Sequence, residues 1–294
     1  MKQLKKIGYY SLLSCSLLIA SCSIDNDDDE QIVTKDLRLN LNGLENLGSD
    51  YLYEGWIIVN GAPVSTGTFS VDDEGKLSKS RFTMMADVLE SASKFVLTIE
   101  PVPDASPLPA DTKLFVGEFN GNSATVSTGT VAPSFDTVKG EYILAAPTGT
   151  GADNEMYSGV WFLNNSSGSP VAGLDLPTLE AGWKYEGWVV IDGVPLSTGT
   201  FTSTSVPDDA TPFSGDNSGP PFPGEDFLKN APSGIEFPTD LRGKTVVISI
   251  EPSPDNSLAP FTLKPLVGMV PTDATGVQTL DSKVSGFPSG NVTR

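Results

Sequence analysis

A seventeen-residue block occurs twice in this chain, and it limits the possible folds more than any other feature. Residues 53–69 read YEGWIIVNGAPVSTGTF, and residues 185–201 read YEGWVVIDGVPLSTGTF. Eleven positions are identical, and the other six exchange similar side chains. The offset of 132 residues is far longer than the roughly 20–50 residues of a solenoid repeat. The duplication therefore predicts two whole domains in tandem.

Each block has the pattern of a β-hairpin. The β-branched run after the Trp is followed by Asn-Gly at residues 60–61 and by Asp-Gly at residues 192–193. These pairs favour a two-residue type I′ turn, because both of its central residues have positive φ. Pro63 and Pro195 follow the turns, and a Pro within a sheet is confined to edge strands or strand entries. We expect a hairpin in each copy, with its second strand at a sheet edge.

A second repeated block places more strands. Residues 95–104 (FVLTIEPVPD) match residues 246–255 (VVISIEPSPD) at an offset of 151, so the second copy carries 19 extra residues, near 205–227. Residues 37–41 alternate as a leading strand, and only residues 87–94 favour a helical turn. Short strands separated by Gly, Pro, Asn and Asp indicate an all-β protein of two tandem Ig-like β-sandwiches.

The two domains are expected at residues 36–138 and 139–294, with the insertion in the second. Strands are also expected at residues 142–146 and 158–163, on either side of a Gly-rich loop. They could complete the first domain, begin the second, or form an extra hairpin between the two.

The first 21 residues predict a lipoprotein signal peptide. Three lysines precede a short apolar stretch, residues 12–20, which is shorter than the roughly 20 residues that cross a bilayer. Residues 18–22 read Leu-Ile-Ala-Ser-Cys, which resembles a bacterial lipobox. After cleavage, Cys22 would carry diacylglycerol and palmitate and would anchor the protein to the membrane. Cys15 would leave with the signal peptide, so the mature chain would have neither a free thiol nor a disulfide.

An acidic tether is expected at residues 22–35. Residues 23–30 read SIDNDDDE, a run that cannot form a packed core and favours a solvated segment. It resembles the acidic export signal of surface lipoproteins in the Bacteroidetes, and a plain spacer is the alternative. The expected location is the outer membrane, on the cell surface.

Composition excludes several classes of function. The chain has no histidine, which excludes Ser-His-Asp and Cys-His catalysis and every histidine metal site. Cleavage would remove three lysines and no acidic residue, taking the formal charge from −19 to −22. Such a surface repels phosphates, so nucleic acid is not an expected partner, whereas cations and basic partners are favoured.

The repeated motifs are similar to the extracytoplasmic C-terminal domain of anti-sigma-K factors (RskA type). That family combines Tyr-x-x-Trp, Gly-x-Pro-Val-Ser-x-Gly-x-Phe, Glu-Pro and Val-x-Gly. The first three motifs occur at residues 53–69 and 100–101 and again at 185–201 and 251–252, where Leu replaces the Val of the second motif. Each copy closes with Val-Gly, at 116–117 and 267–268, without the residue that separates the two in the family motif. The resemblance implies a β-domain. A sigma-binding helical domain and a membrane-spanning helix are not predicted here, so sigma-factor regulation does not follow from the fold.

Aromatic residues are the first candidates for a binding site. Trp56 and Trp188 recur in both copies and are expected in the core. Trp183 is expected to be the most exposed, and with Trp161 it is a possible ligand contact.

Carboxylates are the second candidates. Glu100 and Glu251 precede Pro at strand ends, where a carboxylate commonly caps loop amides, and no spacing marks a catalytic pair. The acidic insertion is expected to be disordered, and calcium binding there is the alternative. We predict no catalytic, cofactor or metal site.

These patterns predict a non-catalytic surface lipoprotein whose duplicated domains act as an interaction or sensing module for an unknown protein or glycan. One alternative is a glycan-binding or glycan-processing lipoprotein. Another is an envelope component of a sigma-factor signalling system.

Overall fold

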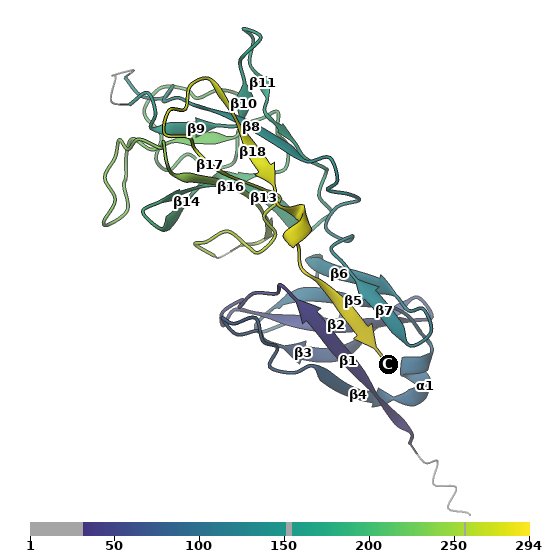
Figure 1. Cartoon of the computed structure of the whole chain (residues 1–294). Helices are drawn as coiled ribbons and strands as arrows, with labels where there is room; N and C mark the ends of the chain where they lie inside the picture. The colour runs from purple at the N-terminus through teal and green to yellow at the C-terminus, as the bar shows by residue number, and fades with distance from the viewer. Residues whose placement is uncertain (1–31, 151–154, 256) are drawn as a thin grey trace, which may run out of the picture. The chain divides into compact units, whose positions relative to one another are not determined.

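The computed structural model describes residues 32–150, 155–255 and 257–294, which are built mainly from β-strands (Figure 1). Besides strands, these residues contain the helix α1 (Ala86–Glu90) and the 3₁₀ turn η1 (Val284–Gly286). The predicted all-β class is therefore confirmed, and α1 is the helical turn expected around residues 87–94. Neither helical segment of this part of the chain is long and apolar enough to cross a membrane. Val33–Arg294 forms one compact unit.

The first copy of the repeat lies in a four-stranded antiparallel sheet with the order β3–β2–β5–β6. The strands are β2 (Tyr51–Val59), β3 (Ala62–Phe69), β5 (Ala92–Pro101) and β6 (Lys113–Glu118). Asn60 and Gly61, with φ of 51° and 81°, form the two-residue turn between β2 and β3, as the type I′ pattern predicts. β3 lies at the sheet edge, in agreement with Pro63.

The second copy repeats this pairing as β14–β13–β16–β17, and here the sheet continues through β18, β8, β9 and β15. Asp192 and Gly193 form the turn between β13 and β14, with φ of 52° and 85°. β12 pairs with β8 outside that order, and β10 and β11 form a separate ribbon. The bounds are β8 Lys139–Leu144, β9 Gly159–Trp161, β10 Leu163–Asn164, β11 Val171–Ala172, β12 Leu174–Asp175, β13 Trp183–Ile191, β14 Val194–Phe201, β15 Gly224–Asp226, β16 Thr245–Pro252, β17 Leu266–Met269 and β18 Val277–Ser282.

A further four-stranded sheet has the order β4–β1–β19–β7. Its strands are β1 (Thr34–Asn42), β4 (Arg81–Met85), β7 (Ser123–Val126) and β19 (Ser289–Thr293). The leucines of β1 are buried and alternate with polar residues, as predicted. Phe82 of β4 lies 6.2 Å from Phe69 of β3 between ring centroids, so apolar side chains of the two four-stranded sheets meet.

The position of β19 corrects the expected domain bounds. Residues 289–294 are expected in the second domain, but β19 pairs with β1 and β7, which belong to the first half of the chain (Figure 1). In the other half, β8 occupies the corresponding place between β12 and β18. In both halves, the strand at this place in the sheet comes from a segment outside the repeated blocks. A local sequence pattern cannot reveal such a pairing, because it depends on residues far apart in the chain.

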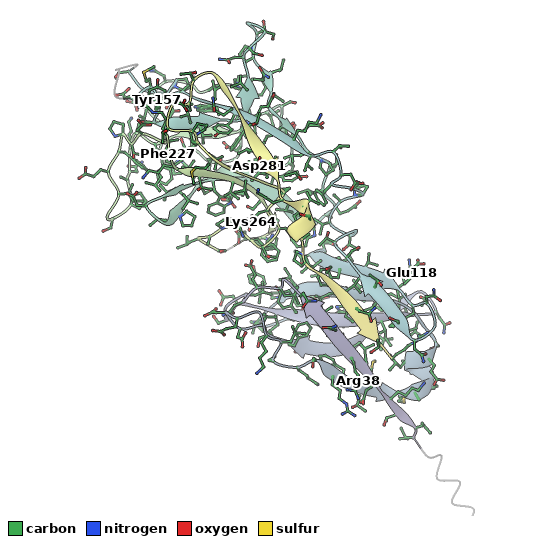
Figure 2. The ribbon with its side chains drawn as sticks, viewed as in Figure 1. Arg38, Glu118, Tyr157, Phe227, Lys264 and Asp281 are labelled. Atoms are coloured by element: carbon green, nitrogen blue, oxygen red, sulfur yellow. The ribbon has the colours of Figure 1, made fainter. Side chains whose placement is uncertain are left out.

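The two segments in which the copies differ lie together. β8 and β9 form the central strands that the sequence assigns to neither domain. They join the sheet of the second copy, and β9 pairs with β15 of the insertion. Residues 205–227 are fully described, and the disorder expected for them is wrong. Phe227, labelled in Figure 2, is buried. It packs against Phe213 and Phe237, with ring centroids 5.7 Å and 5.6 Å away. These aromatic contacts give the Gly- and Pro-rich insertion a core.

Candidate functional site

The repeated Ser-Thr-Gly sequence forms a β-bulge within each hairpin. In the first copy, the register between β2 and β3 shifts after Gly55, which leaves Thr66 as the extra residue. The Thr66 hydroxyl donates to the Gly55 carbonyl at 3.0 Å, and a Cβ on Gly55 would lie 2.5 Å from that hydroxyl. Ser65 donates to the Glu54 carboxylate and accepts from the Gly67 N–H at 3.1 Å. The motif therefore fixes the orientation of Glu54.

The second copy holds Glu186 in the same way. Ser197 donates to Glu186 Oε1 and accepts a hydrogen bond from the Gly199 N–H at 3.0 Å. Gly187 packs more tightly than its counterpart, since a Cβ there would lie 2.3 Å from Thr198 Oγ1.

The Trp and Glu of the repeat belong to a second buried network. Trp56 Nε1 donates to Thr98 Oγ1 at 2.9 Å, the Thr98 hydroxyl donates to Glu100 Oε1, and the Ala110 N–H donates to the same oxygen at 2.9 Å. The core position expected for Trp56 is confirmed, because it is 3% exposed. Glu100 thus accepts a hydrogen bond from a loop amide, as its place at the strand end predicts.

The equivalent network in the second copy ends at Glu251. Trp188 Nε1 donates to Ser249 Oγ at 2.7 Å, and Ser249 donates to Glu251 Oε1. The Phe261 N–H donates to that oxygen at 2.9 Å. Trp188 is buried, as expected.

Glu186 and Glu251 meet Asp255 in a cluster of three carboxylates. One ligand oxygen from each residue lies within 4.8 Å of the other two. Glu186 is 5% exposed and Glu251 is 1% exposed, whereas Asp255 is more open. The Oε2 atoms of Glu186 and Glu251 are buried and have no hydrogen-bond partner among the described residues. Two buried carboxylates thus each have one oxygen that accepts no hydrogen bond from the described residues.

Burial and charge repulsion raise the pKa values of both glutamates in the cluster. Burial raises the pKa of Glu186 to about 7 and the pKa of Glu251 to about 8, and repulsion from Asp255 adds to both shifts. Burial also lowers the pKa of Lys264, although the nearby charges of Glu45 and Glu251 oppose this shift. Ionising a buried carboxylate requires a compensating positive charge or hydrogen bonds.

The first copy has the same residue types at Glu54, Glu100 and Asp104. Within the described part of the chain, however, a group of three carboxylates close enough to share a cation occurs only in the second copy. Burial raises the pKa of Glu54, with smaller contributions from Glu100 and Asp104. The second copy can therefore be tested for cation binding, and the first copy serves as its matched control.

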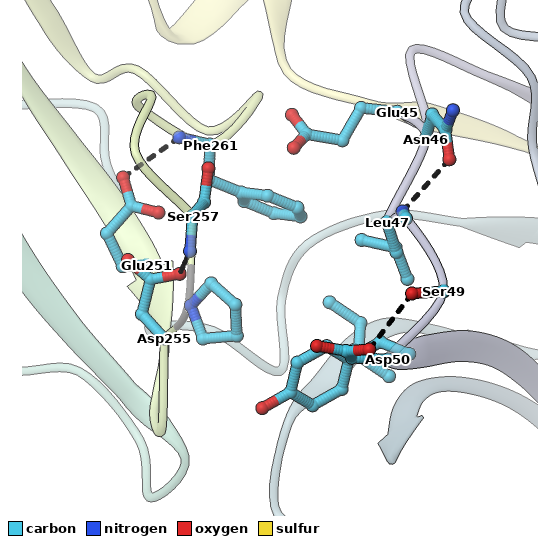
Figure 3. Close-up of a pocket in the computed structure, with 13 residues that line it drawn as sticks. Glu45, Asn46, Leu47, Ser49, Asp50, Glu251, Asp255, Ser257 and Phe261 are labelled. Atoms are coloured by element: carbon cyan, nitrogen blue, oxygen red, sulfur yellow. Dashed lines mark hydrogen bonds between the residues drawn. The ribbon is translucent and has the colours of Figure 1, made fainter. Parts of the chain in front are cut away.

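A cavity of about 330 Å³ opens beside the cluster (Figure 3). Its lining combines residues 45–51 with Ile99, the end of β16 and the loop that follows it, and four of its side chains are acidic: Glu45, Asp50, Glu251 and Asp255. Burial raises the pKa of Glu45 to about 7. The wall also carries the rings of Tyr51 and Phe261.

Neither predicted aromatic contact is exposed. Trp183 is 3% exposed and packs against Phe261 with ring centroids 6.0 Å apart, so the exposure predicted for it is wrong. It lies at the start of β13 and belongs to the main hydrophobic core. Trp161 is 2% exposed and donates to Asp226 at 2.7 Å. Cys22 and residues 22–31 of the tether lie outside the described residues.

The carboxylates of the acidic insertion bind both the central segment and the insertion itself. Asp226 accepts hydrogen bonds from Trp161 and from the Thr148 N–H at 2.7 Å. Glu225 accepts from the Ser214 hydroxyl and, at 3.3 Å, from the Phe213 N–H.

The repeated sequence contained a signal for the cluster. In the register between β13 and β16, Glu186 lies opposite Ser249, so Glu251 is its diagonal neighbour on the same face. The repeated Glu-Pro-x-Pro-Asp motif then brings back Asp255 after the strand ends. Recognising the cluster from sequence requires knowing that these two strands pair and in which register.

Comparison with known proteins gives no family-model match, no match to a curated protein and no match to a solved structure. The resemblance to anti-sigma-K domains therefore stays a prediction from the repeated motifs.

Proposed function

We propose that the protein is a non-catalytic, lipid-anchored envelope protein whose two tandem Ig-like β-domains bind a basic segment of a partner. The observation that carries the binding role is the acidic cavity beside Glu251. Its volume of about 330 Å³ is at the lower end of the roughly 300–1,000 Å³ of ligand sites. Four acidic side chains in its lining favour a Lys or Arg side chain, and the two rings offer apolar contact to its stem.

The anchoring part of the proposal rests on residues 18–22 and on the acidic tether that follows. Wild-type protein produced in bacteria should incorporate radiolabelled palmitate, and the variant Cys22→Ala should not. Label retained by the variant would show that Cys22 is not the lipidated residue.

The non-catalytic part rests on the roles of the repeated carboxylates. Glu100 and Glu251 each accept a loop amide and a hydroxyl, and they are 2% and 1% exposed. These side chains hold loops in place and offer little surface to a substrate. Hydrolysis of a glycan library by the purified protein would contradict the proposal and favour the glycan-processing alternative.

Peptide binding tests the proposed partner class. Fluorescent Lys/Arg-rich peptides should bind the chain from residue 23 onward, whereas acidic peptides of equal length should not. Raising the salt from about 50 to 300 mM should weaken binding, because ion pairing is screened. The double variant Glu45→Gln/Asp50→Asn should bind several-fold more weakly, while Glu118→Gln/Asp175→Asn, at exposed positions outside the cavity lining, should bind normally. Equal losses in both double variants would place binding elsewhere on the acidic surface.

A further inference from the structure

We propose that Glu186, Glu251 and Asp255 bind a Ca²⁺ ion. One oxygen from each carboxylate lies within 4.8 Å of the others. Ca²⁺ holds oxygen ligands at about 2.3–2.6 Å, so two oxygens on opposite sides of the ion lie roughly 4.6–5.2 Å apart. The spacing of the three carboxylates is therefore compatible with a shared Ca²⁺ ion.

The unpaired oxygens are an independent reason for a cation. Glu186 Oε2 and Glu251 Oε2 are buried without a hydrogen-bond partner among the described residues. A buried ionised carboxylate costs several kcal/mol unless a charge or donors compensate it. A divalent cation compensates both carboxylates together.

The surrounding hydrogen bonds orient the two oxygens in advance. In each glutamate, Oε1 is held by a hydroxyl, from Ser197 or Ser249, and in Glu251 also by the Phe261 N–H. These donors fix the rotation of the carboxylate and leave Oε2 for the ion. Hydrogen-bonded partners of this kind typically change metal affinity by about 10–100-fold when removed.

Ligand chemistry selects calcium. All three donors are carboxylates, and the chain has no histidine, which disfavours metals that prefer imidazole ligands, such as zinc, copper and nickel. Mg²⁺ requires shorter, octahedral contacts of about 2.0–2.1 Å, whereas Ca²⁺ accepts irregular sets of 6–8 oxygens. Water from the cavity that Glu251 and Asp255 line can supply the remaining ligands. With three protein side chains, we expect a dissociation constant on the order of 10⁻⁴–10⁻³ M, as in extracellular modules.

The calcium site shares Glu251 and Asp255 with the lining of the acidic cavity, whereas Glu45 and Asp50 belong to the cavity lining alone. Loss of peptide binding in the Glu45→Gln/Asp50→Asn variant and loss of calcium binding are therefore separate results.

Calorimetric titration of the EDTA-treated protein with CaCl₂ at pH 8 tests the site. One Ca²⁺ should bind per chain, and MgCl₂ should bind at least tenfold more weakly. Glu251→Gln should weaken Ca²⁺ binding at least tenfold, whereas the matched variant Glu100→Gln in the first copy should bind normally. Asp255→Asn, on the more open side of the cluster, should also weaken binding at least tenfold and provides a second test if Glu251→Gln misfolds.

Terbium luminescence provides a second readout. Trp188 is linked through Ser249 to Glu251, so excitation of tryptophan should sensitise bound TbCl₃, and CaCl₂ should quench the signal by displacement. Absence of saturable Ca²⁺ binding would overturn the proposal. Equal losses in Glu100→Gln and Glu251→Gln would also overturn it, because they indicate only diffuse attraction to an acidic surface.

Discussion

The buried carboxylate of Glu225 should make stability fall as the pH rises. Its side chain is 0% exposed, and burial raises the pKa of Glu225 from 4.5 to about 7. The folded state therefore holds its proton more tightly than the unfolded state. Its contribution is fully present below pH 4.5 and is lost as the pH rises towards 7.

The magnitude follows from the shift. Each pKa unit corresponds to 1.36 kcal/mol, so roughly 2.5 units amount to about 3 kcal/mol between pH 4 and pH 8. Glu225→Gln removes this titration but keeps an oxygen that can accept from Ser214. Its amide nitrogen faces the Phe213 N–H instead of an acceptor, which costs about 1 kcal/mol. The variant should therefore be about 1 kcal/mol less stable than wild type at pH 4 and about 2 kcal/mol more stable at pH 8.

Urea unfolding in EDTA, followed by tryptophan fluorescence at several pH values, measures this change of sign. All four tryptophans are buried, so their emission should shift to longer wavelength on unfolding. Glu74→Gln, at an exposed position, serves as the control and should parallel wild type. A difference between Glu225→Gln and wild type that stays constant from pH 4 to pH 8 would refute the reasoning.

Four further substitutions test the packing. Gly187→Ala should lower the free energy of unfolding by about 1–3 kcal/mol, because its Cβ would overlap the bulge and a neighbouring ring. Gly55→Ala should lower it less, because the contacts of a Cβ there are longer. Chemical denaturation of both variants measures which of them is the less stable. Val292→Ala leaves a cavity at a fully buried site in β19 and should lower the free energy of unfolding by about 2 kcal/mol. Hydrogen exchange should then increase in β1, and unchanged exchange there would contradict the pairing of β1 with β19. Trp188→Phe removes the donor to Ser249 and should cost roughly 2–4 kcal/mol by thermal unfolding; a neutral effect would show that the network does not stabilise the fold.

The features predictable from sequence are those set by neighbouring residues. The Asn-Gly and Asp-Gly turns, the edge position of Pro63 and the alternation of β1 depend on local φ preferences and on side-chain period, and all are present in the structure. The burial of the repeated Trp56 and Trp188 follows from their place on strands covered on both faces.

The features that were missed depend on contacts between distant segments. Trp183 was expected to be exposed from its Gly-Trp-Lys context, but Phe261, which follows the next strand of the sheet, packs against it. The insertion resembles a disordered segment in composition, yet Asp226 gains a buried donor from Trp161 in the central segment. The cluster of Glu186 and Glu251 likewise exists only because β13 and β16 pair in one register.

The pairing of Arg38 in β1 with Thr293 in β19 has a kinetic consequence. During synthesis at about 5–20 residues per second, the stretch between Val126 and Ser289 takes roughly 8–30 seconds to emerge. Until then β1 and β7 lack the neighbour that separates them, and their unpaired edges are open to other chains. Such distant pairing also slows folding. Although β1 is made first, it should therefore be among the last strands to become protected, and pulse-labelled hydrogen exchange during refolding would show this late protection.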